Sequence, residues 1–349
     1  MVRLSRAEMQ EHNRAKVLAA AQAEFTERGF RDAKIDQIAE RAELTRGAVY
    51  SNFPGKRALY FAVLAQAADQ VPDYPPTART AAEALADFAR AWLARLPLAT
   101  DEARSATRLG RDLLPEIMAD EQVSGPFAQL TNLSAILLGL ALENLDRAGR
   151  LVRAAEIALT TLHGATQLAA AAPGFGEPFG LVRACAQLAA LDLDDAWQPA
   201  YLPHIAPARP VNQPWQPPAA TDALRDEPAL IEADGVLAVL GLHRLSVIEE
   251  ALRAAPSEAE VTAVLVTGNP GELGPLARLA IVELRGCLRA AIPALAWPRL
   301  RVVLDETGAV AAAAGVSAVS DATETAVRVR AGRIVARADG YGACHAASA

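Results

Sequence analysis

The chain of 349 residues is longer than one ordinary helical domain, and its 52% hydrophobic and 21% charged residues exclude an intrinsically disordered protein. We expect two or three domains. The net charge of −7 at pH 7 argues against a protein that is basic over its whole surface. Residues 1–70, however, hold eleven Lys or Arg against nine Asp or Glu, and include all three lysines of the chain, Lys16, Lys34 and Lys56. Phosphate contacts near the N-terminus explain this distribution, and a GC-rich coding bias from Lys to Arg explains it equally well.

The cysteines and the N-terminus exclude several other classes. Cys185, Cys287 and Cys344 have neither Cys-x-x-Cys nor zinc-type spacing, so we expect no disulfide framework, structural metal or cofactor. Residues 1–14 lack an apolar signal core, and no run approaches the roughly 20 apolar residues of a membrane span. We therefore expect a cytoplasmic protein without a membrane segment.

The first predicted helix begins near Arg6 or Arg14 and ends at Arg28. Gly29 is suited to the position after a helix end, where the backbone turns left-handed. Phe30 is expected to fill the core between this helix and the next elements.

The stretch 34–61 contains two short apolar faces at helical spacing, separated by a break at Glu43. Thr45 can cap the second helix, and Pro54 forces Phe53 out of the α region, so this helix ends there. Two short helices joined by a tight turn predict a helix-turn-helix, whose second helix can lie in the DNA major groove. The apolar positions are Ile35, Ile38, Ala39 and Ala42 in the first helix and Ala48, Val49 and Phe53 in the second.

The same stretch resembles the signature of the tetracycline-repressor (TetR) family. The resemblance is specific from about Arg14 to Leu64 and looser to about Trp197. It implies a DNA-binding domain at 1–70 and an all-α ligand-sensing and dimerisation domain at 71–198. Members are mostly homodimeric repressors of palindromic operator DNA that are released by a small molecule in the helical body. The residues that carry the resemblance are Thr45-Arg46-Gly47-Ala48-Val49-Tyr50, Asn52-Phe53, Lys56 and Leu59.

This resemblance assigns roles within the helix-turn-helix. Tyr50 and Lys56 match positions that bind backbone phosphate, and Arg46 is the best candidate for reading a guanine edge. Lys34 stands where the family usually has a hydroxyl cap, so we expect Asp36 to take part of the capping role and Lys34 to add a phosphate contact. The candidate DNA-binding residues are Lys34, Thr45, Arg46, Gly47, Tyr50, Ser51, Asn52 and Lys56.

The sequence from 80 to 197 predicts only helices, near 80–96, 101–113, 115–121, 124–149, 151–172 and 178–191. A stripe of small and apolar residues from Ile157 to Ala171 suits close helix packing, either in the core or, as the resemblance implies, at a dimer face. Candidate effector-pocket residues are polar or aromatic side chains on otherwise apolar helices. They are Trp92, Arg108, Met118, Phe127, Asn132, His163 and Gln167.

Residues 199–230 change character, because eight prolines occur between Pro199 and Pro228. This composition predicts a semi-rigid, partly polyproline II linker that Tyr201 and Trp215 attach to the helical body. An exposed proline-rich ligand for another protein is the alternative.

Residues 231–349 switch to strand periodicity, with predicted strands at 236–240, 261–266, 301–304 and 326–329 and a hairpin at Ala331-Gly332. Helices are expected at 243–254, 272–291 and 308–314. The segment resembles the C-terminal half of thioredoxin-like and peroxiredoxin-like domains. Gly268-Asn-Pro-Gly271 carries no cysteine where we expect a redox nucleophile, and no proline precedes the strand at 326–329. We therefore expect a multidomain protein, all-α followed by α/β, whose last domain is not catalytic.

The leading interpretation is a ligand-responsive, homodimeric repressor that is not an enzyme. One alternative is a redox-sensing regulator that uses Cys287 or Cys344, and another is a thiol-dependent redox enzyme fused to a DNA-binding head. The last domain has a further interpretation as an interaction or dimer-extending module.

Overall fold

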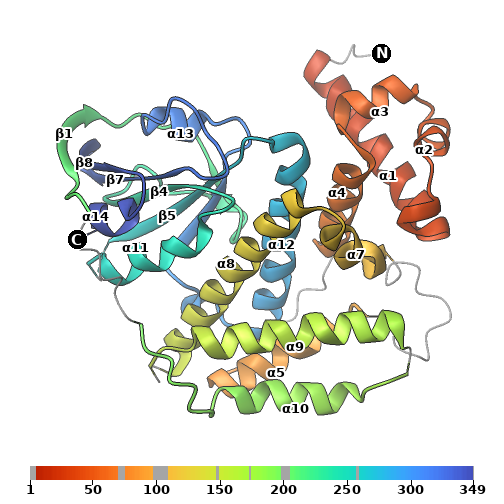
Figure 1. Cartoon of the computed structure of the whole chain (residues 1–349), viewed down its shortest axis with the longest axis horizontal. Helices are drawn as coiled ribbons and strands as arrows, with labels where there is room; N and C mark the ends of the chain where they lie inside the picture. Colours follow the sequence, from red (N-terminus) through yellow and green to blue (C-terminus); the bar gives the residue numbers. More distant parts are fainter. Residues whose placement is uncertain are drawn as a thin grey trace.

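The computed structural model describes residues 5–69, 75–96, 109–146, 149–172, 174–197, 205–256 and 259–348. Figure 1 shows a small helical head near the N-terminus, a helical body beneath it, and a sheet domain on the opposite side from the head. Tyr201 and Arg108 lie outside the described residues.

The head consists of four helices. Ser5 and Glu8 form a capping box at the start of α1 (Arg6–Asp32), and Gly29 interrupts the helix with φ +73°. Gly29 therefore takes the left-handed conformation that we predicted, but one more helical turn follows it. The other three helices are α2 (Ile35–Arg41), α3 (Arg46–Asn52) and α4 (Lys56–Ala68).

An aromatic cluster joins the head to the body. Phe30 packs with Phe25 of α1 and Tyr60 of α4, with ring centroids 6.0 and 4.9 Å away. The Tyr60 hydroxyl donates to the Leu109 carbonyl, and the Phe30 amide donates to the Asp112 carboxylate at 2.8 Å. Phe30 thus fills the space between α1 and α4 and also fixes the head to the body.

The helical body contains α5 (Ala81–Leu93), η1 (Gly110–Asp112), α7 (Leu113–Met118), α8 (Glu121–Asp146), α9 (Val152–Ala171) and α10 (Pro178–Leu188). Among the described residues, α8 alone is long and apolar enough to cross a membrane, with a mean hydropathy of 1.4. We expected no run of about 20 apolar residues, and α8 passes the test of length and composition while including polar residues. Most of that window is buried inside the protein, at 61%, so α8 is the core helix of the body.

The sheet domain has six strands in the order β1-β8-β7-β4-β5-β6. Strands β4, β5 and β6 are parallel, and β7, β8 and β1 continue the sheet in antiparallel pairs. The parallel strands are runs of Val, Leu and Ala because both faces of the sheet are covered. The strands are β1 (Arg209–Pro214), β4 (Gly235–Gly241), β5 (Glu260–Val266), β6 (Leu300–Leu304), β7 (Glu324–Arg330) and β8 (Arg333–Asp339). The helices are η2 (Leu245–Val247), α11 (Ile248–Ala254), α12 (Pro270–Ala291), η3 (Ala294–Ala296), α13 (Ala309–Ala313) and α14 (Ala343–Ser348).

The predicted linker is largely part of this sheet domain. Strand β1 and the small hairpin of β2 (Thr221–Asp222) and β3 (Glu227–Pro228) all fall within 199–230. Prolines are tolerated in β1 because it is an edge strand, which needs hydrogen bonds on one side only. Trp215 is buried in the core of the sheet domain and donates to the Ile231 carbonyl at 2.7 Å, so it does not attach a linker to the helical body.

The sheet domain and the helical body share one hydrophobic core. Helix α12 packs against α4, α5 and α8, and its buried residues are continuous with theirs. In Figure 1, α12 lies beside α4 and α8, between the sheet and the head. The separate last domain that we expected is therefore packed firmly against the rest of the chain.

Candidate DNA-binding site and effector cavity

The outer face of α3 is the candidate DNA-binding surface. The Thr45 hydroxyl accepts the Ala48 amide at 3.2 Å and caps the helix as predicted. Val49 and Phe53 are buried, and the Phe53 backbone is extended just before Pro54, which ends the helix. The opposite side is solvent-exposed, and it carries Thr45, Arg46, Gly47, Tyr50 and Ser51.

Arg46 is held by two neighbours in the free protein. Its Nη1 lies 3.3 Å from Asp36 Oδ1, and its Nη2 lies 3.5 Å from the Tyr50 hydroxyl. The hydrogen bond to Tyr50 and then the charge of Asp36 raise the pKa of Arg46. Asp36 therefore pairs with Arg46 across the helix-turn-helix. Our prediction that it takes part of the capping role in α2 was wrong.

Ser51 and Asn52 both donate to the Ala48 carbonyl, at 2.9 and 2.8 Å. Ser51 is exposed, whereas Asn52 is half-buried and its carbonyl accepts Arg14 at 3.3 Å. Ser51 thus remains on the exposed face of α3, while Asn52 fixes the end of this helix. Arg14, which we did not predict as a site residue, also covers the Phe53 ring at 4.4 Å.

The two candidate phosphate-binding lysines differ in their surroundings. Lys56 Nζ donates to the Arg31 carbonyl at 3.0 Å and lies 4.7 Å from the Phe30 ring centroid, and its burial lowers its pKa. Lys34 is exposed at the N-cap position of α2. Within the described part of the chain its side chain has no hydrogen-bond or ion-pair partner, so the hydroxyl cap is absent as predicted.

A small cavity lies where the helical body meets α12. Its volume is about 30 Å³, which holds one or two water molecules. The His163 ring meets the rings of Trp92 and Phe127 edge-on, at 4.9 and 5.8 Å, and burial lowers the pKa of His163 to about 4. The lining residues are Trp92, Phe127, Thr131, Ser134, Leu159, His163, Ala280, Glu283 and Leu284.

The cavity brings together three of the seven predicted effector residues, Trp92, Phe127 and His163. Asn132 and Gln167 are half-buried on α8 and α9 outside this lining. The other two do not line it either: Met118 is 81% exposed at the end of α7, and Arg108 lies outside the described residues.

The wall formed by α12 was missed. Glu283 of α12 faces the cavity, and its burial raises the pKa of its carboxyl group against the opposing charge of Arg95. One sequence signal was present: the apolar residues of α12 between Leu273 and Leu288 lie on more than one face, so the sheet alone cannot cover them.

The three cysteines are buried and unpaired. Burial raises the pKa of Cys185 and of Cys287 to about 11, and raises that of Cys344 well above its ordinary value. A thiolate is therefore disfavoured at each position. No group of His, Cys, Asp and Glu suited to a metal ion occurs among the residues that the structure describes.

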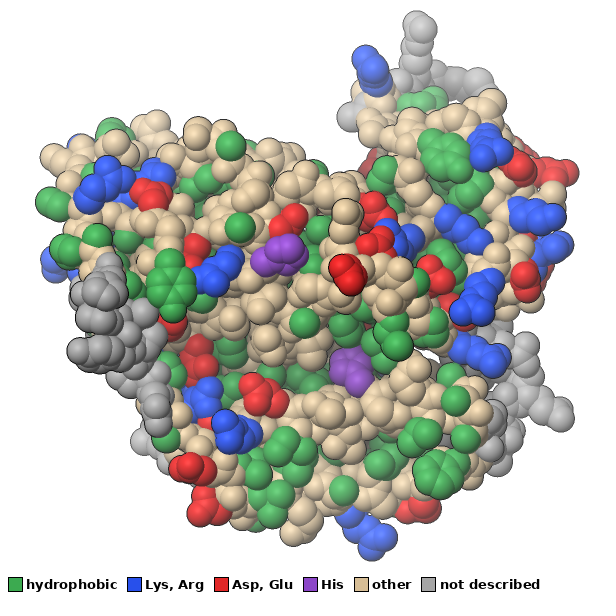
Figure 2. All heavy atoms as spheres, in the orientation of Figure 1, with side chains coloured by type: hydrophobic (Ala, Val, Ile, Leu, Met, Phe, Trp, Pro, Cys, Tyr) green, Lys and Arg blue, Asp and Glu red, His purple; other side chains and the backbone are tan. Residues whose placement is uncertain are grey.

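An exposed apolar surface follows α9 and α10. The predicted stripe on α9 is half-buried at Ile157 and Thr161 and exposed at Gly164, Leu168 and Ala171, so it faces outward. Figure 2 shows apolar side chains gathered over these two helices at the lower edge of the molecule. We call Leu168, Phe175, Phe179 and Leu191 the α9–α10 patch; each is about half or more exposed.

The head thus has the architecture of helix-turn-helix DNA-binding domains, with α3 as the recognition helix. Residues 17–63 match the family model described as "Bacterial regulatory proteins, tetR family". The chain therefore carries a TetR-family N-terminal helix-turn-helix domain.

Two regulators of Pseudomonas putida are similar over the same region. The HTH-type transcriptional regulator SrpR is 46% identical over 65 residues, which are 19% of this chain and 30% of that protein. The uncharacterized HTH-type transcriptional regulator TtgW, from a strain of the same species, is also 46% identical over 65 residues, 48% of its length. The chain thus spans less than half of each of these relatives.

One of the similar solved structures is that of the transcriptional regulator FadR from Bacillus subtilis in complex with stearoyl-CoA. The alignment covers 50% of this chain and 97% of the FadR chain, at 16% sequence identity. The TM-score is 0.29, too low for an argument about fold or ligand.

Proposed function

We propose that this protein is a cytoplasmic transcriptional regulator, a homodimeric repressor that binds a palindromic operator and is released by a small molecule in its helical body. Residues 1–70 bind DNA, residues 71–198 sense the effector and dimerise, and residues 231–349 form a non-catalytic α/β domain. The observation that carries the proposal is the exposed face of α3 with Arg46, Tyr50 and Ser51, on a helix capped by Thr45.

Binding to DNA follows from this face. With α3 in the major groove, Arg46 exchanges Asp36 for the O6 and N7 atoms of a guanine. Tyr50 and Lys34 contact backbone phosphates at the groove edge. Lys56 reaches a phosphate by giving up the Arg31 carbonyl, and the N-terminus of α4 adds a favourable dipole there.

The α9–α10 patch supports a dimer. Phe175 and Phe179 are exposed by 68% and 75%, which is unusual for phenylalanine on a monomer surface. An isologous pairing of two such patches buries them and places two heads for two half-sites.

The effector site is the cavity of Trp92, Phe127 and His163, whose aromatic and polar lining resembles small-molecule sites. The α/β domain has a strand order of β8-β7-β4-β5, with one parallel and two antiparallel pairs, which supports a thioredoxin-like domain. Its buried thiols argue against the redox-sensing alternative.

The test is fluorescence anisotropy with the DNA upstream of the gene at low salt. The wild type is expected to bind, and Arg46→Ala is expected to lose at least about tenfold in affinity for its preferred site. No binding by the wild type at low salt overturns the proposal.

A further inference from the structure

Helix α4 belongs to both the head and the body. It starts directly after α3 and is capped by Asp69, and α1 packs on its head side. Its residues 58–65 are buried on all faces because α12 of the sheet domain covers the side that α1 leaves open. The sheet domain therefore contacts the helix that carries the head.

Ion pairs join α4 and α12 at both ends. Arg57 Nε donates to Glu272 at 3.0 Å near the start of both helices, and Arg285 pairs with Asp69 near their ends. The two anchors are twelve residues apart on α4 and thirteen apart on α12, so both span about 18–20 Å. The helices therefore run parallel with matched length. An antiparallel arrangement would oppose Arg57 to Arg285 and Asp69 to Glu272.

These contacts are well supported by neighbouring groups. Arg57 also pairs with Asp120 at 2.7 Å. Arg285 is only 5% exposed, and it donates to the Ala223 carbonyl at 3.2 Å. Ion pairs of half-buried groups with several partners are screened less than isolated surface pairs.

The start of α12 also touches the turn between α3 and α4. A Cβ atom added at Gly271 would lie 3.1 Å from Pro54 Cγ. The sheet domain thus reaches the end of the recognition helix, and a shift of α12 displaces the head directly.

The same helix closes the effector cavity. Ala280, Glu283 and Leu284 of α12 face Trp92 and His163. Since the cavity holds only one or two water molecules, a larger molecule there must displace one of its walls, and α12 is one of them.

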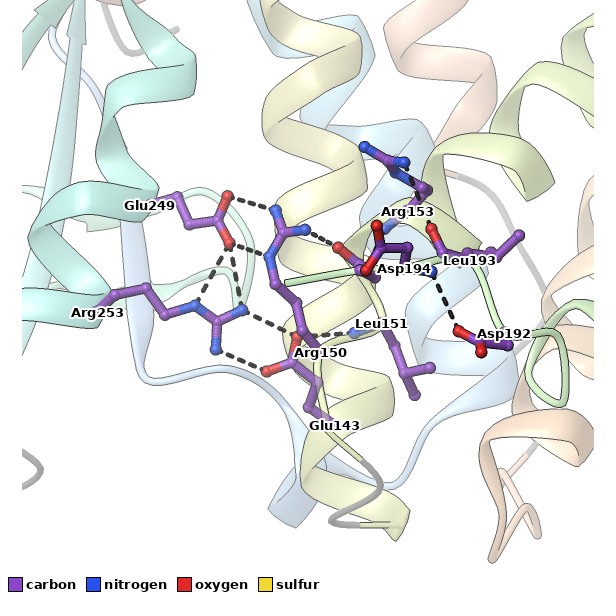
Figure 3. Close-up of polar contacts among 10 residues, drawn as sticks. Glu143, Arg150, Leu151, Arg153, Asp192, Leu193, Asp194, Glu249 and Arg253 are labelled. Atoms are coloured by element: carbon purple, nitrogen blue, oxygen red, sulfur yellow. Dashed lines mark hydrogen bonds and ion pairs between the residues drawn. The ribbon is translucent and has the colours of Figure 1, made fainter. Parts of the chain in front are cut away.

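A second contact between the sheet domain and the body is a charge network around α11 (Figure 3). Arg253 of α11 binds Glu143 at the end of α8, at 2.9 Å, and Arg150 binds Glu249 of α11 at 2.8 Å. Arg150 also pairs with Asp195, which follows α10. These side chains are largely buried, so α11 is a fixed point relative to the body.

We propose that α12 transmits effector binding to the DNA-binding head: a molecule that enlarges the cavity displaces α12, and the paired ends of α4 and α12 carry this displacement to α3. The inference rests on the proposed function for its effector and operator. The coupling of α12 to the head is independent of both.

The test uses two nearly isosteric variants of the full chain, Glu272→Gln and Asp69→Asn. Each removes one of the two ion pairs that join α4 to α12. The matched control is Glu306→Gln. It removes the ion pair between Glu306 and Arg278 of α12, which lies within the sheet domain, and it changes the charge by the same amount. Hydrogen exchange of amides in α2 and α3 and operator affinity are measured for each.

We expect faster exchange in α2 and α3 and an operator affinity at least about fivefold weaker for Glu272→Gln and for Asp69→Asn, because a loosely held head must be ordered on binding. Glu306→Gln should match the wild type in both. The inference is overturned if Glu272→Gln and Asp69→Asn both show the amide exchange and the operator affinity of Glu306→Gln. A wild type that binds no operator, with faster head exchange in the two variants, removes the proposed function and leaves the coupling intact.

Discussion

The guanidinium of Arg46 lies 3.3 Å from the carboxylate of Asp36, so an acid of α2 pairs with the side chain that we propose reads a base. Both groups are exposed. Under the proposed function the pair must open before Arg46 enters the groove, so we expect Asp36 to compete with DNA for Arg46.

Replacing Asp36 with Asn should raise operator affinity about two- to fivefold, because an exposed ion pair of modest strength no longer has to open. Anisotropy titrations at constant salt measure this. Glu40→Gln is the control, since it removes the same charge from the same helix without touching Arg46. An equal gain in the two variants would show a general charge effect and contradict the competition.

Lys34→Thr should lower the slope of log affinity against log salt by about 0.9 without changing the preferred sequence, because one phosphate contact is lost. Binding is measured over a series of salt concentrations. Arg278→Ala, which removes a cation from the sheet domain, should leave the slope unchanged. A slope for Lys34→Thr equal to that of the wild type removes Lys34 from the phosphate contacts.

Phe179→Glu should convert the proposed dimer to a monomer, because it would place two carboxylates in the apolar interface that we propose for this face. Sedimentation velocity measures the mass. Leu295→Glu is the control: Leu295 is fully exposed on η3, away from the α9–α10 patch. A dimeric Phe179→Glu variant contradicts the assignment of this face.

The protein should lose stability as the pH falls from about 6.5 to about 4. Burial lowers the pKa of His163 from its ordinary value to about 4, so in this window the unfolded state binds a proton that the native state does not. The loss attributable to His163 is about 2–3 kcal/mol at the acidic end.

His163→Gln, which cannot take up this proton, should show a correspondingly smaller loss. The measurement is urea unfolding of the wild type and the variant at several pH values, compared as a difference so that other titrating groups cancel. Parallel curves across the window would show that His163 titrates normally in the folded protein.

Operator binding should not respond to mild oxidants or thiol reagents. Cys287 and Cys344 are buried, and a raised pKa keeps each thiol protonated. Native protein should react with a thiol-specific reagent only after denaturant is added. Rapid labelling, together with a loss of DNA binding that a Cys287→Ser variant abolishes, would restore the redox-sensing alternative.

The helix-turn-helix could be predicted closely because its signals are local. The Thr45 cap, the restriction before Pro54 and the left-handed Gly29 each act over one helical turn. The strands of the sheet domain were also predictable, since their apolar runs depend on burial alone. The proline-rich segment was misjudged, because proline excludes a central strand but not the edge position that β1 occupies.

The candidate sites divide in the same way between features set by local sequence and features set by distant contacts. The sequence predicted which residues lie on the outer face of α3, but not that Asp36 holds Arg46, since that pair depends on the angle between two helices. Three of the predicted effector residues, chosen for their polar or aromatic character on apolar helices, line one cavity. The fourth wall comes from α12, more than 100 residues further along the chain.

The sequence by itself determined the helices of the head, the exposed face of α3 and the strands β4 to β8 of the sheet domain, because periodicity, caps and turn residues act between near neighbours. Only the tertiary structure decided that α12 lies along α4. Arg57 and Glu272 are 215 residues apart, and their pairing depends on a core that the helical body and the sheet domain complete together. No local pattern encodes such a contact, because α4 and α12 would each form in the same way without it.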